Sequence, residues 1–255
     1  MASGATPIYE PVSDGWHHVL WFPDLGLVYE KTTPGLTDKL NTNKGTFADS
    51  AVMEKAITQL QEMAKLGFFG KNFLSDSTAD LDKNLGSGKY AMALAQLSEP
   101  DLIAKAVPGI TADTFGFFIP PLADNQIIDY NPAAPSKFIY SGSKYIQEAK
   151  DYFKYLTKQE NLQFTVDTDT TVVSLGFTGL KDKFSTAVKE FIASSPEKGT
   201  VYQAQIKYLN PQWMDIGKDL TAMFTTSLSP KDVLKNIDKR RAEQAKAAKD
   251  PAWPN

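Results

Sequence analysis

Apolar side chains recur at helical spacing in several parts of the chain. Within residues 50–66 they fall three and four positions apart, as one face of an amphipathic helix requires, and Gly67 stands where a helix end favours glycine. The same spacing occurs over residues 144–156 and 181–193. The pattern therefore predicts a helix in each segment, with one face on a hydrophobic core.

Two more helices are marked by the residues at which they begin. Asn210 followed by Pro211 is typical of an N-cap and a first helical position, and an apolar stripe starts at Trp213. Ser229 and Pro230 open the last predicted helix in the same way. The sequence thus predicts a helical carboxy-terminal region.

The apolar runs that predict strands are shorter than the helices. They lie at residues 8–9, 90–94, 114–119, 137–140 and 172–175. Short strands that alternate with longer helices predict an α/β fold. The stretch 122–136 is rich in proline and polar residues, which predicts a loop or a crossover between lobes.

Composition narrows the function classes. The chain has 255 residues, of which 42% are hydrophobic and 22% charged, as in ordinary globular proteins. A net charge of -3 gives no electrostatic reason to expect a nucleic-acid partner. The absence of cysteine excludes disulfides, thiol nucleophiles and cysteine metal sites. Residues 1–6 lack the basic and apolar pattern of a signal peptide, and we expect the chain to start inside a domain.

Three ordered stretches carry a family resemblance. They are residues 9–18, residues 85–94 with the following 115–121, and the helix that opens at Ser143 and runs to residue 156. The second resembles the F-x-x-G-K-A-A-M segment and later G-x-x-P-L-P strand of carbohydrate-binding proteins of ABC importers, the maltose-binding type. The third resembles their S-K-x-K-E-A-A-x-x-F-x-x-Y-L helix.

This resemblance implies a family 1 extracellular solute-binding protein with a type II periplasmic-binding-protein-like α/β fold. It also implies a carboxy-terminal portion, truncated at the amino terminus so that most of the first lobe is missing. We expect residues 1–125 to form the second-lobe α/β region. Residues 126–180 would hold the crossover and the remaining first-lobe elements, and residues 181–255 the helical region that closes the lobes.

Residues 13–17 contain the side-chain types that sugar binding needs. A flat aromatic face covers the apolar side of a pyranose ring, and acids, amides and imidazoles bind its hydroxyls. The resembled family turns this segment toward its cleft. The resemblance therefore implies Trp16 as the stacking residue, with Asp14 and His17 as polar contacts beside Ser13. The alternative is that Trp16 belongs to the core and that Asp14 only caps a helix.

Two further candidates follow from the same resemblance. Trp213 stands where the family often has a second aromatic platform, although it also continues the apolar stripe of its helix. Gln96 follows the strand 90–94, where the family's cleft loop comes next, although a glutamine there could simply be a surface residue.

The sequence predicts no catalytic residues, metal site or cofactor. His17 and His18 are the only histidines, and adjacent helical residues point about 100° apart, so they are poor partners for one metal ion. The nucleophile elbow and the phosphate-binding loop are both missing. Carboxylates are plentiful, so a carbohydrate-active hydrolase stays open as an alternative. A scaffold or interaction module with no ligand of its own is another.

The favoured hypothesis is a non-catalytic carbohydrate-binding component of an ABC importer. Its partners would be a mono- or oligosaccharide and the transmembrane permease subunits, with no nucleic acid. We expect an extracellular or periplasmic location and a parent protein anchored as a lipoprotein. A missing lobe would leave apolar surface bare, and such patches drive association, so a homodimer through that surface is a further prediction.

Overall fold

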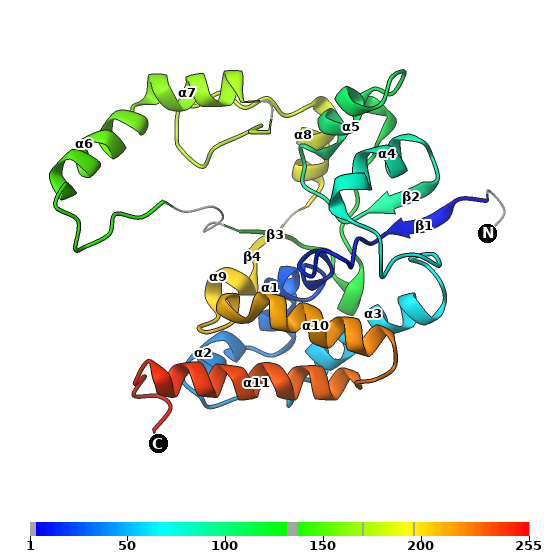
Figure 1. Ribbon diagram of the computed structural model, residues 1–255, viewed down its shortest axis with the longest axis vertical. Helices are drawn as coiled ribbons and strands as arrows, with labels where there is room; N and C mark the ends of the chain where they lie inside the picture. The colour runs from blue at the N-terminus through cyan, green and yellow to red at the C-terminus, as the bar shows by residue number, and fades with distance from the viewer. Residues whose placement is uncertain (1–3, 132–136, 170, 196, 255) are drawn as a thin grey trace. The chain divides into compact units, whose positions relative to one another are not determined.

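The computed structural model describes residues 4–131, 137–169, 171–195 and 197–254, which fall into two compact units (Figure 1). Unit 1 comprises Met1–Ala95, Phe118–Asn131 and Ser195–Asn255, and unit 2 comprises Gln96–Phe117 and Pro132–Ser194. Each unit is assembled from separate stretches of chain. The division into lobes after residues 125 and 180 stays a prediction.

The strands of unit 1 form short parallel pairs in the described part of the chain. Strand β1 (Thr6–Tyr9) pairs with β2 (Tyr90–Ala93), and β3 (Ile128–Tyr130) pairs with β4 (Lys198–Thr200). Predicted strands at 8–9 and 90–94 are confirmed, while β3 and β4 were not predicted.

Three strand predictions are wrong. Residues 114–119 begin in a 3-10 turn, η4 (Ala112–Thr114). Neither they nor residues 137–140 and 172–175 are strands in the structure. A strand is stabilised by hydrogen bonds to a neighbouring strand. These apolar segments have no paired strand among the described residues, so their β propensity is not realised.

Unit 1 is built mainly from helices. Its α-helices are α1 (Gly26–Thr32), α2 (Leu36–Asn41), α3 (Ala51–Lys65), α4 (Leu81–Gly86), α9 (Tyr202–Gln205), α10 (Trp213–Phe224) and α11 (Pro230–Ala247). Its 3-10 helices are η1 (His17–Val19), η2 (Pro23–Leu25), η3 (Thr78–Asp80), η5 (Leu122–Asp124) and η6 (Asn210–Gln212). The predicted helix from Asn210 therefore begins as a 3-10 turn and becomes α-helical at Trp213.

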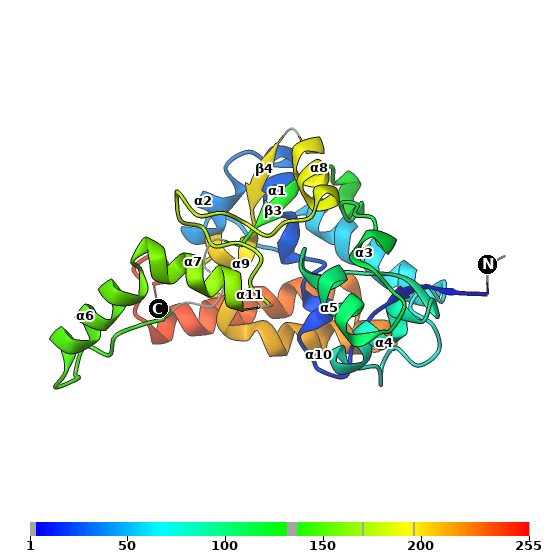
Figure 2. The ribbon, with the colours of Figure 1, turned by 90° about the horizontal axis from the view of Figure 1, so that it is seen from above.

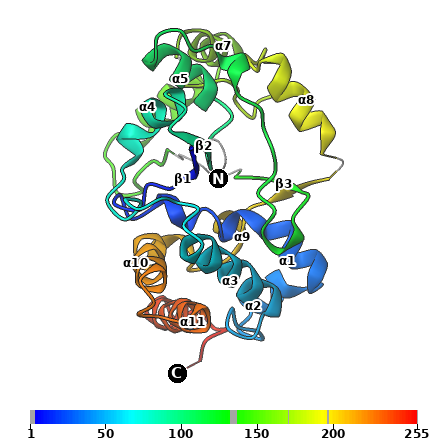
Figure 3. The same ribbon diagram turned by 90° about the vertical axis from the view of Figure 1, so that its right-hand side faces the viewer.

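The core of unit 1 lies where α3, α10 and α11 meet, as Figure 3 shows. Leu60 of α3, Leu220 of α10 and Leu234 of α11 are all at most 1% exposed. The helix ends follow the sequence signals. Gly67 has φ 76°, and Ser229 Oγ accepts the amide hydrogen of Asp232 at 3.2 Å. As predicted, Gly67 follows the end of α3, and Ser229 caps the start of α11.

Unit 2 contains α5 (Glu99–Ala106), α6 (Ile146–Leu156), α7 (Gln159–Thr168) and α8 (Thr186–Ser194). The helix predicted over 144–156 is confirmed as α6, and that over 181–193 begins later, as α8. The apolar face of α6 is only partly covered, and no residue of α6 is buried. Among the described residues, no helix combines the length and apolar composition that a membrane span requires.

Helix α1 lies next to the pair β3–β4 (Figure 2). Asp24, just before α1, and Asp129, in β3, each carry a half-buried carboxyl group. Asp129 Oδ2 accepts the amide hydrogen of Leu27 at 3.1 Å, and a Cβ on Gly199 would lie only 1.9 Å from Asp129 Oδ1. Burial raises the pKa of Asp129 to about 6. Burial, together with the nearby Asp129 charge, raises the pKa of Asp24 to about 7.

These raised values predict how the stability of unit 1 depends on pH. The folded state binds more protons than the unfolded state between the ordinary carboxyl pKa of about 4 and these raised values. Stability should therefore fall as pH rises from about 4 to 7. Asp24→Asn should reduce this loss by about 4 kcal/mol, because the pKa of Asp24 rises from about 4 to about 7 and each pKa unit corresponds to about 1.4 kcal/mol.

Urea unfolding at several pH values measures this effect. All four tryptophans, Trp16, Trp21, Trp213 and Trp253, lie in unit 1, so their fluorescence follows its unfolding alone. Asp38→Asn, at an exposed position of α2, is the matched control and should keep the parental pH dependence. An Asp24→Asn protein with the parental pH dependence would contradict the prediction.

Candidate functional site

The turn of residues 13–16 is held against the segment that precedes α4. Ser13 donates both its amide hydrogen, at 3.1 Å, and its hydroxyl hydrogen, at 2.8 Å, to the carbonyl oxygen of Asp76. Asp14 accepts from the Ser77 hydroxyl at 3.0 Å and from the amide and hydroxyl of Thr78 at 2.6 and 2.5 Å. The turn is thereby fixed on η3 from one side.

The Asp14 carboxylate already has partners on both of its oxygens. Burial by itself would raise the pKa of Asp14, but the hydrogen bonds from Thr78 and Ser77 outweigh it and keep this pKa below its ordinary value. Asp14 therefore stays ionised and orients the turn. Asp14 does not cap the helix that follows it, since η1 begins after Trp16 without a side-chain cap, and its partners belong to η3 instead. A direct sugar contact of Asp14 stays a prediction.

Helix α10 fixes the turn from the other side through a close backbone approach. A Cβ on Gly217 would lie 1.9 Å from the carbonyl oxygen of Gly15, and one on Gly15 would lie 2.9 Å from Met214 Cε. Gly15 also has φ 78°, which favours glycine. Two glycines thus allow the turn and the helix to touch.

The contact brings the two predicted tryptophans together. Trp213 Nε1 donates to the carbonyl oxygen of Trp16 at 3.1 Å. The Trp16 side chain stays 38% exposed and Met214 is 49% exposed, whereas Trp213 is half-buried and packs on the core. We call Trp16, Trp213 and Met214 the aromatic face of unit 1. Trp213 packs against the hydrophobic core, and its indole N–H also holds the backbone of Trp16.

His17 lies beneath this face and is almost fully buried. Its Nδ1 lies 2.8 Å from Glu10 Oε1 and its Nε2 lies 2.9 Å from the carbonyl oxygen of Leu94. Glu10 is fully buried and also accepts from Trp21 Nε1 at 2.5 Å. Both ring nitrogens of His17 thus have protein partners, so the geometry favours a supporting role over the predicted sugar contact.

The sixth predicted residue, Gln96, lies in unit 2. Its side chain is exposed, and its backbone carbonyl accepts the amide hydrogen of Glu99 at 3.0 Å. Gln96 as a sugar contact stays a prediction. Sequence reasoning missed Glu10, Met214 and Gly217, whose roles depend on contacts between distant parts of the chain.

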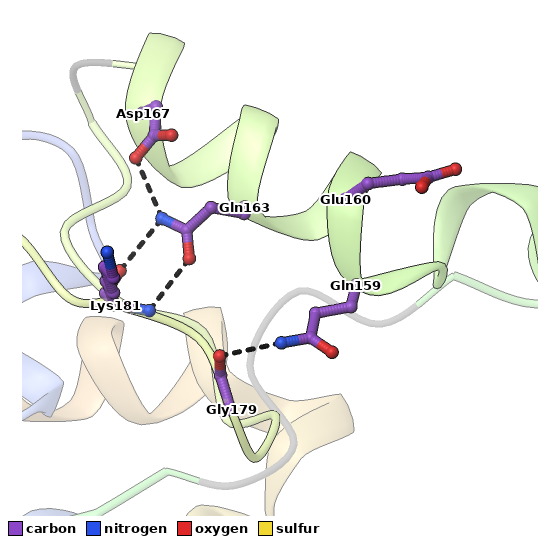
Figure 4. Close-up of a pocket in the computed structure, with 6 residues that line it drawn as sticks. All are labelled: Gln159, Glu160, Gln163, Asp167, Gly179 and Lys181. Atoms are coloured by element: carbon purple, nitrogen blue, oxygen red, sulfur yellow. Dashed lines mark hydrogen bonds between the residues drawn. The ribbon is translucent and has the colours of Figure 1, made fainter.

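A hollow of about 540 Å³ in unit 2 is another candidate site (Figure 4). It is lined by Gln159, Glu160, Gln163, Asp167, Gly179 and Lys181. Gln159 donates to the Gly179 carbonyl at 2.9 Å, and Gln163 bonds both the amide and the carbonyl of Lys181. These amides hold segment 179–181 on α7, and no aromatic side chain lines the hollow, so it lacks a stacking surface.

A smaller hollow of about 360 Å³ lies in unit 1 beside α1. It is bordered by segment 123–127 and by the ion pair between Lys31 and Glu197. Within the part of the chain that the structure describes, no cluster of three or more His, Cys, Asp or Glu residues is arranged to hold a metal ion. The aromatic face is therefore the candidate that best fits a ligand with an apolar ring surface.

Comparisons with known proteins define the fold. No protein-family model matches the sequence, and no curated protein matches it by sequence. A putative binding protein MsmE of Bacillus subtilis, in an open conformation, is similar in structure, with a TM-score of 0.73 and 15% identity over 96% of this chain and 62% of that one. A sugar transporter of Bacillus licheniformis in complex with stachyose matches with a TM-score of 0.70 and 14% identity over 94% and 61%.

A third similar structure is that of a protein whose family is stated. A family 1 extracellular solute-binding protein of Bifidobacterium longum subsp. infantis matches with a TM-score of 0.58 and 16% identity over 95% of this chain and 62% of that one. The chain therefore has the periplasmic-binding-protein-like α/β fold of solute-binding proteins, and the fold prediction is confirmed. It spans less than two thirds of the length of these proteins.

The contact between Gly217 and Gly15 gives a testable prediction. Alanine in a helix is normally more stable than glycine by about 1 kcal/mol. At Gly217 the added methyl group meets the Gly15 carbonyl at 1.9 Å, so Gly217→Ala should instead destabilise unit 1 by about 2 kcal/mol. Urea unfolding followed by tryptophan fluorescence measures the change.

Lys218→Ala is the matched control, since Lys218 is the next residue of α10 and is exposed. We expect this variant to stay within about 0.5 kcal/mol of the parent. Equal stability of Gly217→Ala and the parent would show that the backbone contact is not tight in solution.

Proposed function

We propose that the chain is the carboxy-terminal portion of the carbohydrate-binding component of an ABC importer. The observation that carries the proposal is the exposed Trp16 ring on a turn that is fixed from both sides. Such a ring provides a preformed apolar surface for one face of a pyranose. The fold supports the proposal, because one of its structural neighbours is a sugar transporter in complex with stachyose.

The aromatic face suits reversible binding of a sugar. Stacking on Trp16 buries the apolar C–H surface of the ring, and polar side chains bind its hydroxyls. No ordering of the turn is needed on binding, since Asp14 and Trp213 already hold it. Preorganisation of this kind lowers the entropic cost of association. We propose a mono- or oligosaccharide as the ligand, with Ser13 as a candidate polar contact in unit 1. Gln96, in unit 2, stays a separate candidate.

The same proposal includes the location of the protein and its partners in transport. A solute-binding protein delivers its sugar to transmembrane permease subunits, and it acts outside the cytoplasmic membrane. We therefore propose an extracellular or periplasmic location, a lipoprotein anchor in the parent protein, and permease subunits as protein partners. The function is non-catalytic, and the structural neighbours give no support to the hydrolase alternative.

Calorimetry against a panel of sugars tests the ligand class. The panel should hold monosaccharides and oligosaccharides, stachyose among them, with non-sugar solutes as negative controls. Trp16→Ala should weaken binding of the preferred sugar about 30-fold, because loss of an aromatic contact costs about 2 kcal/mol. Trp16→Phe should lose less, since a smaller aromatic ring remains.

Trp253→Phe is the matched control, because Trp253 is buried in the carboxy-terminal segment, where it contacts Tyr208. Its affinity for sugar should equal that of the parent. Equal affinity of Trp16→Ala and the parent would exclude Trp16 as the stacking residue. A chain that binds no sugar in the panel would remove support for sugar binding by this portion.

We also propose that unit 2 mediates self-association. Large apolar side chains are exposed over α6 and α7 and in the neighbouring segments of unit 2, namely Phe138, Tyr140, Tyr145, Tyr152, Tyr155, Phe164 and Phe177. We call this set the exposed aromatic surface of unit 2. Apolar patches of this kind promote association, and a second copy of the chain is always available.

Light scattering after size-exclusion chromatography tests the self-association. The parent should approach the mass of a dimer at high concentration. Tyr152→Glu combined with Tyr155→Glu should shift the protein toward the 28.1 kDa monomer, because the added charges oppose burial of this surface. Asp113→Glu, at an exposed position elsewhere in unit 2, is the control. A monomeric parent at high concentration would contradict self-association.

A further inference from the structure

A buried charged pair lies directly under the aromatic face of unit 1. The side chains of Glu10 and His17 are 0% and 4% exposed, and 2.8 Å separates Glu10 Oε1 from His17 Nδ1. The His17 ring meets the Trp16 ring edge-on, with 5.3 Å between ring centroids and 67° between ring planes. Glu10 follows β1, and the Leu94 carbonyl that His17 contacts follows β2.

The hydrogen-bond partners fix the protonation of His17. A carbonyl oxygen only accepts, so Nε2 must carry a hydrogen toward Leu94. The other nitrogen faces a carboxylate, and a hydrogen there completes an imidazolium–carboxylate pair. Burial alone would lower the pKa of His17, but the hydrogen bond and charge of Glu10 outweigh it and raise this pKa above its ordinary value.

The other titratable groups around His17 act more weakly. Asp14 on the turn also raises the pKa of His17. The neighbouring His18 donates its Nε2 hydrogen to the Gly217 carbonyl at 2.8 Å, and burial lowers its pKa, which keeps it neutral. Asp24 also interacts with the charge of His17, but burial raises the pKa of Asp24 to about 7, so only about half of it is ionised at neutral pH. Glu10 is thus the charge that pairs with His17.

We propose that the Glu10–His17 pair is a positioning element that sets the orientation of the Trp16 ring for its ligand without touching the ligand. The pair anchors the ring from beneath, while Trp213 holds the backbone of the same residue. This inference deepens the proposed function and rests on Trp16 being the stacking residue. It predicts that ligand affinity weakens as pH rises and His17 loses its proton from Nδ1.

The experiment follows the Trp16 ring directly, with and without sugar. Protein labelled with 5-fluorotryptophan gives a ¹⁹F NMR signal for each tryptophan, and Trp16→Phe assigns that of Trp16. The labelled parent, His17→Gln and Glu10→Gln are compared from pH 5 to 9. His18→Gln is the matched control, since His18 is an adjacent buried histidine whose ring contacts Phe224.

In the parent, the Trp16 signal should titrate at a pH above the ordinary histidine pKa of about 6.5. His17→Gln should abolish this titration and move the signal toward that of free 5-fluorotryptophan, while the Trp253 signal stays in place. Glu10→Gln should also displace the Trp16 signal. Affinity for the sugar that binds the parent should fall about tenfold in both variants, equivalent to about 1.4 kcal/mol. His18→Gln should leave the Trp16 signal and its titration unchanged.

The double variant Glu10→Gln with His17→Gln separates positioning from simple loss of stability. Two neutral amides can hydrogen-bond in place of the charged pair, so the Trp16 signal should return toward its parental position. A Trp16 signal that does not titrate in the parent and does not move in either single variant would overturn the inference. If the parent binds no sugar, the proposed function fails, and the NMR signals still decide whether the pair orients Trp16.

Discussion

The structure of unit 1 depends on one fully buried carboxylate, that of Glu10. A charge removed from water is tolerated only when it is paired and hydrogen-bonded. Glu10 meets this condition with His17 and Trp21, which lie seven and eleven positions further along the chain. The chain therefore folds back around the carboxylate after β1. This reversal of the chain places the turn of residues 13–16 at the surface and restricts its conformation.

The second constraint is the close contact between that turn and α10. Gly217 has no side chain, so the helix backbone can approach the Gly15 carbonyl directly. The approach brings Trp213 close enough to donate a hydrogen bond to the Trp16 backbone. The turn is thus held by hydrogen bonds from Ser77 and Thr78 on one side and by α10 on the other. Trp16, which is 38% exposed, lies on this turn, and its indole ring is the feature on which the proposed sugar site depends.

The two units differ in how much apolar surface they bury. Unit 1 buries side chains from α3, α10 and α11 in a shared core. In unit 2, α6 has no buried residue, and Tyr152 and Tyr155 are more than half exposed. The apolar segments 114–119 and 137–140 likewise have no paired strand among the described residues. In unit 2 an amphipathic pattern therefore does not ensure that the apolar face of a segment is buried. Burial requires a partner surface, and the described residues do not provide one for these segments.

The sequence by itself determined the features that depend on neighbouring residues. Helical spacing located α3 and α6, Gly67 and Ser229 marked helix ends, and ordered motifs indicated the solute-binding fold. It also placed Trp16 and Trp213 among the candidates. Each of these signals depends on residues that are close together in the sequence, because helix periodicity and capping act over a few positions.

Only the tertiary structure decided how those candidates are used. It placed His17 in a buried pair with Glu10, and it gave both Asp14 oxygens partners at Ser77 and Thr78. It also paired β3 with β4, which are too short to stand out in sequence. The physical reason is that burial, strand pairing and charge pairing depend on which distant segments meet, and residue order alone does not specify those contacts.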